Sequence, residues 1–375
     1  MSTSRPPLRD SYEGLYNRAR SLARAGDLDQ ASELYRRLVD RLGRLSDRIL
    51  ARRPELLDLQ RQARLEFGSL LAAEGRYAEA IEVEQVLLET HPGESDQWRS
   101  ELAVLRAAKG EVDVALSELQ ELAQESPDEP KRWIILGREC RLAGRLSEGQ
   151  AALNQALAVC QEGDTDSLAG AHYERFLLFK EMRQPDDAMS AWEEALKQNP
   201  EVGRTVREVY TMLTESGRYS QAQRYIARDD NALQTGFQQG LIASLTGRPA
   251  DARQAWRQVA AQDPDKFEYG HDAWVEAVLR LGDPEPALLW LQDSLPKYAF
   301  SSRMFALSGI GWAMRGDPEL ASVLFQRAIN LMRQDRPGRQ KLDSADWRLL
   351  DSLVTDDKTK ATLKPYFAVV ETLWG

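Results

Sequence analysis

The segment PKRWIILGRECRLAGRLSEGQAALNQAL, residues 130–157, contains the spacing that decides the fold. Within it, Gly144 is followed five residues later by a second small residue, Gly149. Glycine can end a helix in a left-handed cap, and a small residue early in the next helix lets the two helices cross closely. The segment therefore predicts a tight helical hairpin.

The same spacing recurs along the chain. Glycine is followed after five residues by alanine at Gly26, Gly75, Gly110, Gly217, Gly247, Gly282 and Gly316. Several successive glycines are 34 or 35 residues apart, and such a fixed period is typical of a helical repeat. One further unit, centred on Arg183 and Ala188, fills the long interval between Gly144 and Gly217. The spacing thus predicts about nine hairpins.

The composition favours an all-α solenoid. Hydrophobic residues make up 42% of the chain, and alternating β-branched runs are rare. An amphipathic hairpin cannot bury its apolar stripe alone, so neighbouring hairpins stack. We expect one elongated domain over residues 11–335, after a disordered tail at residues 1–10. Residues 336–375 are expected to form capping helices, at 343–355 and 359–374, that cover the last stacking face.

The quoted segment also carries a family pattern. Trp133, Leu136, Gly137, Leu153 and Ala156 stand where tetratricopeptide repeats have an aromatic, a leucine, a small residue, a bulky residue and an alanine. Across residues 12–335 the chain resembles a tetratricopeptide repeat protein. The resemblance implies an α-α superhelix whose first helices line a concave groove for ligands. We therefore expect a scaffold or adaptor that binds a protein segment in this groove.

Seven residues at the groove positions define a candidate partner-binding site. They are Lys131, Arg138, Arg141, Tyr173, Lys180, Arg204 and Arg207. Six cations on one inner face stand out against a net charge of −10, so the site predicts binding of an acidic peptide, a C-terminal carboxylate or a phosphorylated segment. The alternative is that these are ordinary solvated positions, because Arg and Lys are good helix formers.

The next two units have a different set of groove residues. Phe237, Leu241, Tyr269, Asp272, Glu276 and Leu279 predict an apolar and mildly acidic surface. Such a surface would suit a basic or apolar part of the same ligand. Alternatively, Phe237 and Leu241 pack within the solenoid.

The interval between Gly26 and Gly75 is 49 residues, longer than the repeat. The spacing of Leu38, Leu42, Leu45 and Ile49 predicts that the second helix continues toward Pro54, as part of an insertion helix around 38–60 with an exposed apolar seam. Residues 36–64 also hold nine arginines against four acids. This stretch could mediate self-association with the acidic residues 111–130, or contact a partner helix or acidic surface. Nucleic acid is an unlikely partner, because the stretch has no aromatic platform and the net charge repels phosphates.

The sequence gives little support for an enzyme. His91, His172 and His271 fit turn or packing positions, and Cys140 and Cys160 fit core thiols. Common catalytic and metal-binding motifs are missing, so we expect no catalytic residue, metal or cofactor. A second possible function is a ligand-responsive sensor or regulatory subunit of a multi-protein complex.

The chain is expected to be cytoplasmic. Its N-terminal residues lack the apolar core of a signal peptide. No stretch approaches the roughly 18 apolar residues of a membrane-spanning helix.

Overall fold

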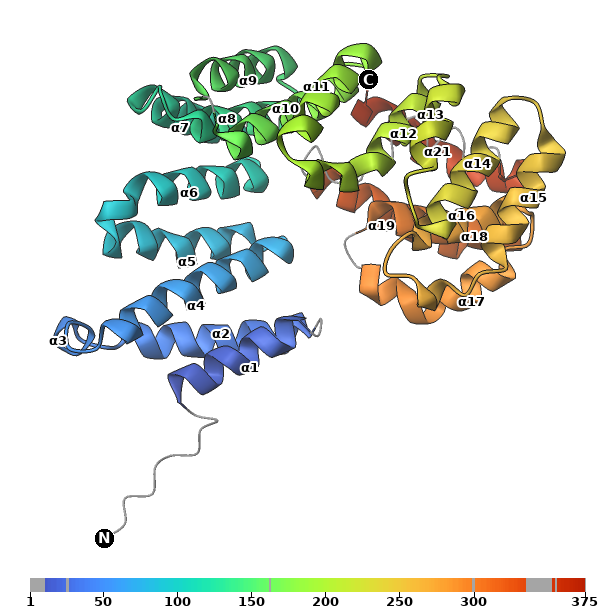
Figure 1. Cartoon of the computed structure of the whole chain (residues 1–375). Helices are drawn as coiled ribbons and strands as arrows, with labels where there is room; N and C mark the ends of the chain where they lie inside the picture. Colours follow the sequence, from blue (N-terminus) through green and yellow to red (C-terminus); the bar gives the residue numbers. More distant parts are fainter. Residues whose placement is uncertain are drawn as a thin grey trace, which may run out of the picture. The chain divides into compact units, whose positions relative to one another are not determined.

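The computed structural model describes residues 11–24, 27–161, 163–298, 301–334, 353–354 and 356–374. In this part of the chain the secondary structure is helical, and successive helices form nine pairs joined by short turns (Figure 1). The predicted all-α architecture of about nine hairpins is confirmed.

The chain divides into two compact units, Met1–Glu139 and Cys140–Gly375. The first unit contains α1 (Tyr12–Arg24), α2 (Leu28–Gly43), α3 (Asp47–Leu50), α4 (Pro54–Ala73), α5 (Tyr77–Thr90), α6 (Ser95–Lys109) and α7 (Val112–Glu125). The division falls within α8 (Pro130–Leu142). The second unit continues with α9 (Leu146–Val159), α10 (Thr165–Glu181), α11 (Pro185–Gln198), α12 (Val206–Glu215), α13 (Tyr219–Ile226), α14 (Ala232–Leu245), α15 (Pro249–Ala260), α16 (His271–Arg280), α17 (Glu285–Ser294), α18 (Ser302–Arg315), α19 (Pro318–Gln334) and α21 (Asp357–Trp374). Short 3-10 helices include η3 (Pro200–Thr205) and η5 (Leu295–Tyr298).

The turn within each hairpin explains the recurring glycine. Gly144 has a φ of 75°, a left-handed conformation that suits glycine. The next amide, that of Arg145, donates a hydrogen bond of 2.8 Å to the carbonyl of Cys140, which closes the helix as a Schellman motif. In the hairpin centred on Arg183, this arginine adopts a φ of 57° and Gln184 makes the equivalent bond to Phe179. The left-handed turn is therefore kept in this hairpin, although arginine stands where the other turns have glycine.

The small residue after each turn is buried, as the spacing predicts. At these positions Ala31, Ala80, Ala115, Ala188, Ala222, Ala252, Ala287 and Ala321 are each at most 1% exposed. In the last hairpin, the Cβ that Gly309 lacks would lie 3.0 Å from the Phe325 ring of α19. Small residues thus set how closely the two helices of a pair approach.

Replacing Ala321 by phenylalanine should therefore destabilise the second unit. The added ring would have to enter a packed α18–α19 contact, and such overpacking costs about 1–3 kcal/mol. Thermal unfolding followed by circular dichroism would measure the loss. Ala151→Phe, at an exposed position of α9, is the matched control and should change stability little. Equal stability of the two variants would contradict the assigned register.

Each unit has its own hydrophobic core. In the first unit one cluster extends from Leu15 to Leu105 and includes Tyr35 and Phe67, whose rings stack at 6.2 Å. The second unit contains two clusters, one around Trp192 and the other around Trp274. Within each unit, successive helices contact one another and so bury the apolar stripe of each hairpin.

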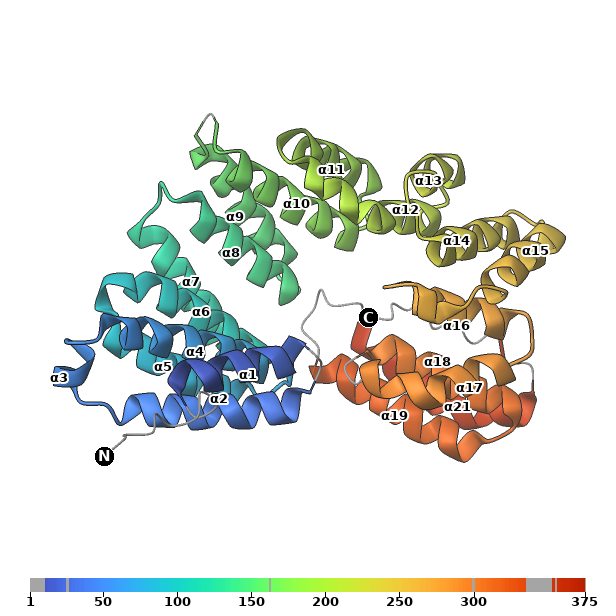
Figure 2. The same cartoon turned by 60° about the horizontal axis from the view of Figure 1, so that its bottom comes forward.

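The prediction of one continuous insertion helix around residues 38–60 is wrong. Helix α2 ends at Gly43, and a separate turn of helix, α3, precedes α4. After α2 has ended, the carbonyl of Ser46 accepts hydrogen bonds from the amides of Ile49 and Leu50 and so starts a new turn. The predicted apolar seam is exposed only in part, since Leu38 and Leu42 are 0% exposed, Leu45 is half-buried and Ile49 is 42% exposed. Both cartoon views place α3 between the C-terminal end of α2 and the start of α4 (Figure 2).

At the C-terminal end, α21 packs on α19. Val354 and Leu363 join the core of the second unit, and the rings of Phe325 and Tyr366 lie 5.9 Å apart. The helix expected at 359–374 thus begins at Asp357. Most of the helix expected at 343–355, and the tail expected at 1–10, lie outside the described residues.

Candidate functional site

The first two predicted site residues lie on α8, within the first unit. Lys131 is exposed, and it forms no ion pair with a described residue. Arg138 is 39% exposed, and its Nε lies 3.2 Å from a carboxylate oxygen of the adjacent Glu139. Lys131 is therefore the more available of the two cations for an external anion.

Arg141, at the end of α8, is buried in the second unit. Its side chain is 4% exposed, and its guanidinium lies 3.0 Å from Glu174 and 2.7 Å from Glu181 of α10. Burial lowers the pKa of Arg141, but the two carboxylates raise it more, so the net pKa lies above its ordinary value. Arg141 thus joins α8 to α10, and a ligand would have to break this ion pair to reach it.

Tyr173 and Lys180 lie seven residues apart on α10, and the structure brings them to the same partner. The Tyr173 hydroxyl donates a hydrogen bond of 3.3 Å to one oxygen of Glu208 on α12, and Lys180 Nζ lies 3.2 Å from the other. Burial, and then the charge of Glu208, raise the pKa of Tyr173 above its ordinary value. These two predicted residues are therefore held by an acid of the next hairpin.

The last two predicted residues differ in exposure. Arg204, in η3, is 84% exposed and lies 2.8 Å from Glu201 of the same short helix. Arg207, on α12, is 31% exposed and lies 3.0 Å from Asp272 of α16. A surface pair such as that of Arg204 contributes little and opens readily, so Arg204 is the more accessible of the two.

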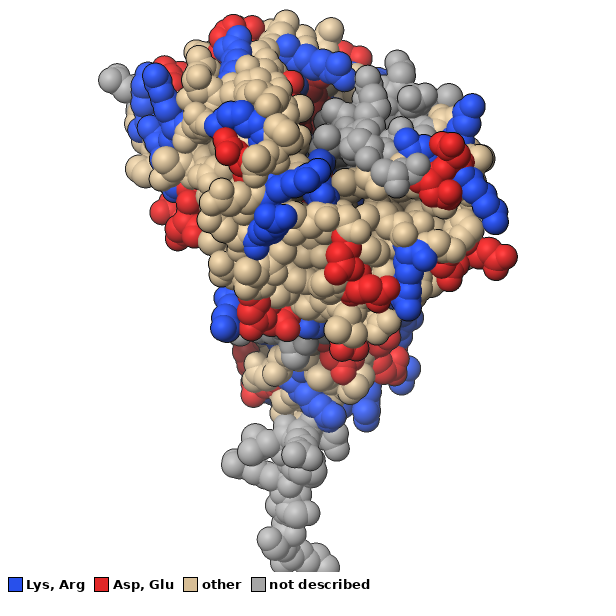
Figure 3. All heavy atoms as spheres, turned by 90° about the vertical axis from the view of Figure 1, so that its right-hand side faces the viewer, with Lys and Arg blue, Asp and Glu red and all other residues tan. Residues whose placement is uncertain are grey.

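Acids from neighbouring helices therefore neutralise much of the predicted cationic set. Sequence reasoning selected positions on the first helices and missed Glu174, Glu181 and Glu208. One signal was available, because Arg141 and Glu174 are 33 residues apart, close to one repeat. On the face of the molecule in Figure 3, basic and acidic residues are interspersed with uncharged surface.

The surface expected to be mildly acidic is instead an internal ion-pair network. Asp272 and Glu276 of α16 are 12% and 1% exposed at the side chain. Arg303 of α18 contacts both, at 3.1 Å and 2.5 Å, and Arg280 lies 2.5 Å from Glu276. Burial raises the pKa of Asp272, but Arg207 and Arg303 lower it more, so it stays ionised. The prediction that Asp272 and Glu276 form an acidic ligand surface is therefore wrong. Phe237 packs in the core of the second unit, as the alternative interpretation predicts.

A second group of cations lies where the chain turns between α2 and α4. Arg44, Arg48 and Arg52 are exposed there, and none of them forms an ion pair with a described residue. We call these three residues the arginine tip. Ile49, in the same turn, is 42% exposed. The tip therefore offers three available guanidinium groups beside an apolar side chain.

Arg64 of α4 lies at the base of this turn. Its side chain is 9% exposed, and its Nε is buried without a hydrogen-bond partner among the described residues. Its Nη2 lies 3.5 Å from the position that a Cβ would take at Gly43, the last residue of α2. Burial lowers the pKa of Arg64, and the charge of Asp40 partly offsets this effect. The turn thus carries positive charge both at its surface and beneath it.

The described residues show no metal-binding arrangement. Among them, no group of three or more His, Cys, Asp and Glu side chains is placed to hold a metal ion. Within the same part of the chain, no helix has both the length and the apolar character needed to cross a membrane.

Comparison with known proteins identifies the repeat. Residues 16–95 match the family model of the tetratricopeptide repeat. A search of curated proteins finds no match. The resemblance predicted from the sequence is therefore confirmed, and proteins built from this repeat are generally non-catalytic.

Several solved structures are similar to the chain. A tetratricopeptide repeat protein from Parabacteroides merdae is 11% identical, with 80% of this chain and 98% of that chain covered and a TM-score of 0.39. PilF from Pseudomonas aeruginosa is 18% identical, with 60% of this chain and 97% of that chain covered and a TM-score of 0.35. A chain of the Cut9–Hcn1 hetero-tetramer of APC/C is 13% identical, with 92% of this chain and 76% of that chain covered and a TM-score of 0.40.

Proposed function

We propose, from the tetratricopeptide repeat at residues 16–95 and the hairpins that follow it, that the protein is a scaffold that binds an acidic protein segment. The fold supports a role in protein interaction, because stacked hairpins present extended surfaces. The acidic character of the partner is inferred from the arginines that the fold leaves available.

One observation carries this proposal, namely the three exposed guanidinium groups of the arginine tip, which form no ion pair with a described residue. Guanidinium groups bind carboxylates through paired hydrogen bonds, and cations without an internal partner need not break an existing ion pair to do so. Arg141, Lys180 and Arg207 each have such an internal partner. The tip is therefore better placed than these residues to contact a partner.

The partner segment should also contact Ile49. This side chain is 42% exposed in the middle of the tip, and its burial against an apolar residue would add to the charge attraction. An extended segment that alternates acids with apolar residues fits this surface. A highly acidic segment without apolar residues should bind more weakly and with a steeper dependence on salt.

Charge reversal of the tip tests the proposal. The probe is a fluorescein-labelled peptide of glutamate, leucine and glycine, and its binding is followed by fluorescence anisotropy. Changing Arg44, Arg48 and Arg52 together to Glu should weaken binding about tenfold or more, because three favourable charge contacts become repulsive. The matched control changes Arg224, Arg253 and Arg257, which are exposed on other helices, to Glu. It should weaken binding much less.

Two other outcomes would reject the tip as the site. Equal weakening by both triple variants would show that net charge alone drives binding. A loss caused instead by Lys131→Glu, Arg138→Glu and Arg204→Glu would place recognition on the predicted groove residues. If wild-type protein binds no acidic peptide, then the acidic partner is wrong. Sedimentation of the same proteins would show whether the tip mediates self-association.

A further inference from the structure

The arginine tip has a counterpart of opposite charge within the first unit. Residues 111–129, which contain α7 and the turn after it, carry seven acids and no base. Residues 44–53, which contain the tip, carry four arginines and one aspartate. Oppositely charged surfaces attract each other and fix the orientation in which they meet. The two stretches are therefore complementary in charge.

Neighbouring helices neutralise only some of the acids around α7. Four of them are paired with cations of α6 and α8, as Lys109–Glu111, Arg106–Glu118, Arg99–Glu125 and Arg132–Glu129. Asp113 also has an interaction partner. Glu121 and Asp128, by contrast, are exposed and form no ion pair with a described residue. These two carboxylates are therefore available to cations from outside the chain.

An exposed apolar residue accompanies these acids, as Ile49 accompanies the arginines of the tip. Val114 of α7 is 58% exposed. Positions 114, 117, 121 and 124 follow the spacing of one helix face, and all four are exposed. At a rise of about 1.5 Å per residue, Val114 and Glu121 are about 10 Å apart along this face. We call Val114, Glu121 and Asp128 the acidic face.

The arginine tip is too far from the acidic face of its own chain to contact it. Helix α2 contacts α4, and α5, α6 and α7 follow, each in contact with the helix before it. Figure 1 shows α4, α5 and α6 between the α2–α4 turn and α7. With about 8–10 Å between packed helices, the three steps from α4 to α7 amount to about 24–30 Å. An acidic face that meets the tip must therefore belong to another molecule.

We propose that the arginine tip binds the acidic face of a second copy of this chain. The inference rests on the proposed function, because it takes the tip as the surface that binds acids. The three arginines would meet the carboxylates of Glu121 and Asp128. Ile49 would then pack against Val114, which removes two exposed apolar side chains from water.

This contact would join two different surfaces. After two copies have met, one of them still offers a free tip and the other a free acidic face. Such a contact therefore lets further copies add, unless a ring closes. It would also occupy the tip, so that self-association and binding of an acidic segment from another protein would compete.

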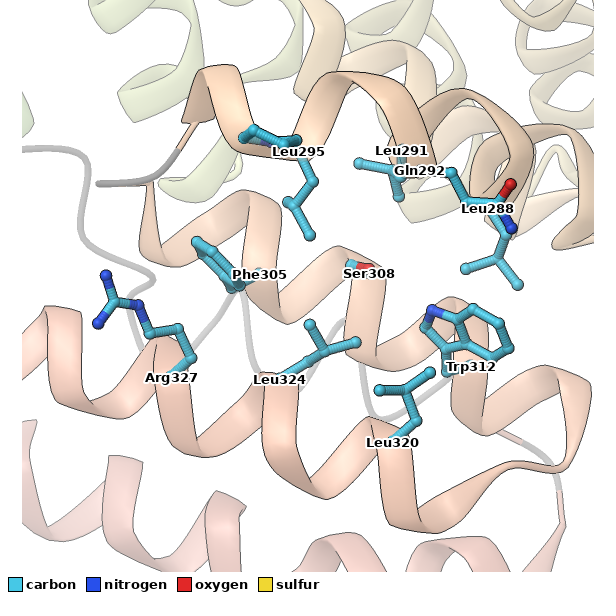
Figure 4. Close-up of a pocket in the computed structure, with 11 residues that line it drawn as sticks. Leu288, Leu291, Gln292, Leu295, Phe305, Ser308, Trp312, Leu320, Leu324 and Arg327 are labelled. Atoms are coloured by element: carbon cyan, nitrogen blue, oxygen red, sulfur yellow. The ribbon is translucent and has the colours of Figure 1, made fainter. Parts of the chain in front are cut away.

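Another apolar surface of the chain provides a control. A groove of about 350 Å³ lies in the second unit, between α17, α18 and α19 (Figure 4). Leucines of all three helices line it, together with Phe305 and Trp312 of α18. Accessible apolar surface of this kind also favours contact between proteins. Leu324→Lys places a charge in the groove and so distinguishes association through the groove from association through the tip.

Sedimentation velocity of the full chain at increasing concentration tests the proposal. Wild-type protein should form dimers and larger species, and salt should dissociate them, because the contact is electrostatic. Changing Arg44, Arg48 and Arg52 together to Glu should raise the dissociation constant about tenfold or more. Changing Glu121 and Asp128 together to Lys should have an effect of the same size. A mixture of the two variants should associate again, because opposite charges then face each other.

Three further variants locate the contact. Changing Glu82 and Glu89 together to Lys is the matched control, because these acids are exposed on α5, seven residues apart, and form no ion pair with a described residue. This control and Leu324→Lys should associate as the wild type does. Val114→Ser should weaken association several-fold without a change in charge, because it removes apolar contact area. Circular dichroism checks that all variants are folded.

Several results would overturn the inference. Wild-type protein that stays monomeric at every concentration would do so. Association that survives charge reversal of the acidic face, or a mixture of variants that stays monomeric, would show that the tip does not bind α7. Loss of association in folded Leu324→Lys would place the contact between copies in the groove instead.

The peptide of glutamate, leucine and glycine tests the proposed function separately, at a protein concentration where the chain is monomeric. Peptide binding at the tip without self-association at any concentration would overturn only the present inference. Self-association that follows the two charge reversals, without peptide binding, would support the inference and reject the extended acidic segment as the partner.

Discussion

Glu276→Gln is expected to lower the free energy of unfolding of the second unit by about 3–5 kcal/mol, the usual cost of breaking a buried ion pair by removing one charge. The Glu276 side chain is 1% exposed and lies 2.5 Å from both Arg280 and Arg303. The variant would leave these two guanidinium groups, 6% and 13% exposed, without that carboxylate. The physical reason for the loss is that Arg280 would be buried without its carboxylate, while Arg303 would keep only Asp272 of the two acids that it now contacts.

Urea unfolding followed by circular dichroism would measure this effect. Glu285→Gln is the matched control, because Glu285 forms a surface ion pair with Arg315 and is 59% exposed. The control should change stability by less than about 1 kcal/mol. A similarly small change for Glu276→Gln would mean that water or Asp272 compensates the arginines, and the network would then contribute little to stability.

Glu84→Gln is expected to stabilise the first unit at pH 8 and to have little effect at pH 4. Glu84, on α5, is 5% exposed, and its Oε2 is buried without a hydrogen-bond partner among the described residues. Burial, together with the negative charge of Glu101, raises the pKa of Glu84 to about 7 from its ordinary value of 4.5. Gly68 of α4 leaves room for this side chain, since a Cβ there would lie 2.5 Å from Glu84 Oε1.

The direction of the pH effect follows from this raised pKa. Between about pH 4.5 and 7, the folded state holds a proton on Glu84 that the unfolded state has lost, so stability falls as pH rises. At about 1.4 kcal/mol per pKa unit, the loss above pH 7 is about 3 kcal/mol, and glutamine would abolish it. Urea unfolding at pH 4 and pH 8 would measure the difference between variant and wild type. Glu82→Gln, exposed on the same helix, is the control; a difference independent of pH would contradict the ionisation of Glu84.

Local chemistry explains why the hairpins were predictable. A left-handed turn at Gly144 and a buried small residue at Ala252 or Ala321 are requirements of single positions, so they leave a direct pattern in the sequence. The course of the chain after Gly43 was less predictable, because leucine spacing does not reveal which carbonyl closes a turn. There the Ser46 carbonyl starts α3 and ends the expected continuous helix.

The candidate site was only partly predictable for a different reason. The sequence shows which positions in the first helix of each hairpin carry Lys or Arg. Whether such a charge is available to a ligand, however, depends on acidic residues of the next hairpin. Glu208 holds Lys180, and Glu174 and Glu181 hold Arg141. Such contacts depend on side-chain directions across two packed helices, which the spacing along one helix does not specify.

By itself, the sequence determined the helical repeat, its period and the buried small residues at each turn, because these features arise from contacts within one hairpin. Only the tertiary structure decided which charges are neutralised and which remain exposed. It also revealed the groove between α17, α18 and α19. These properties depend on how side chains from several helices meet, and this is why Arg141 is buried in an ion pair while the arginine tip remains available.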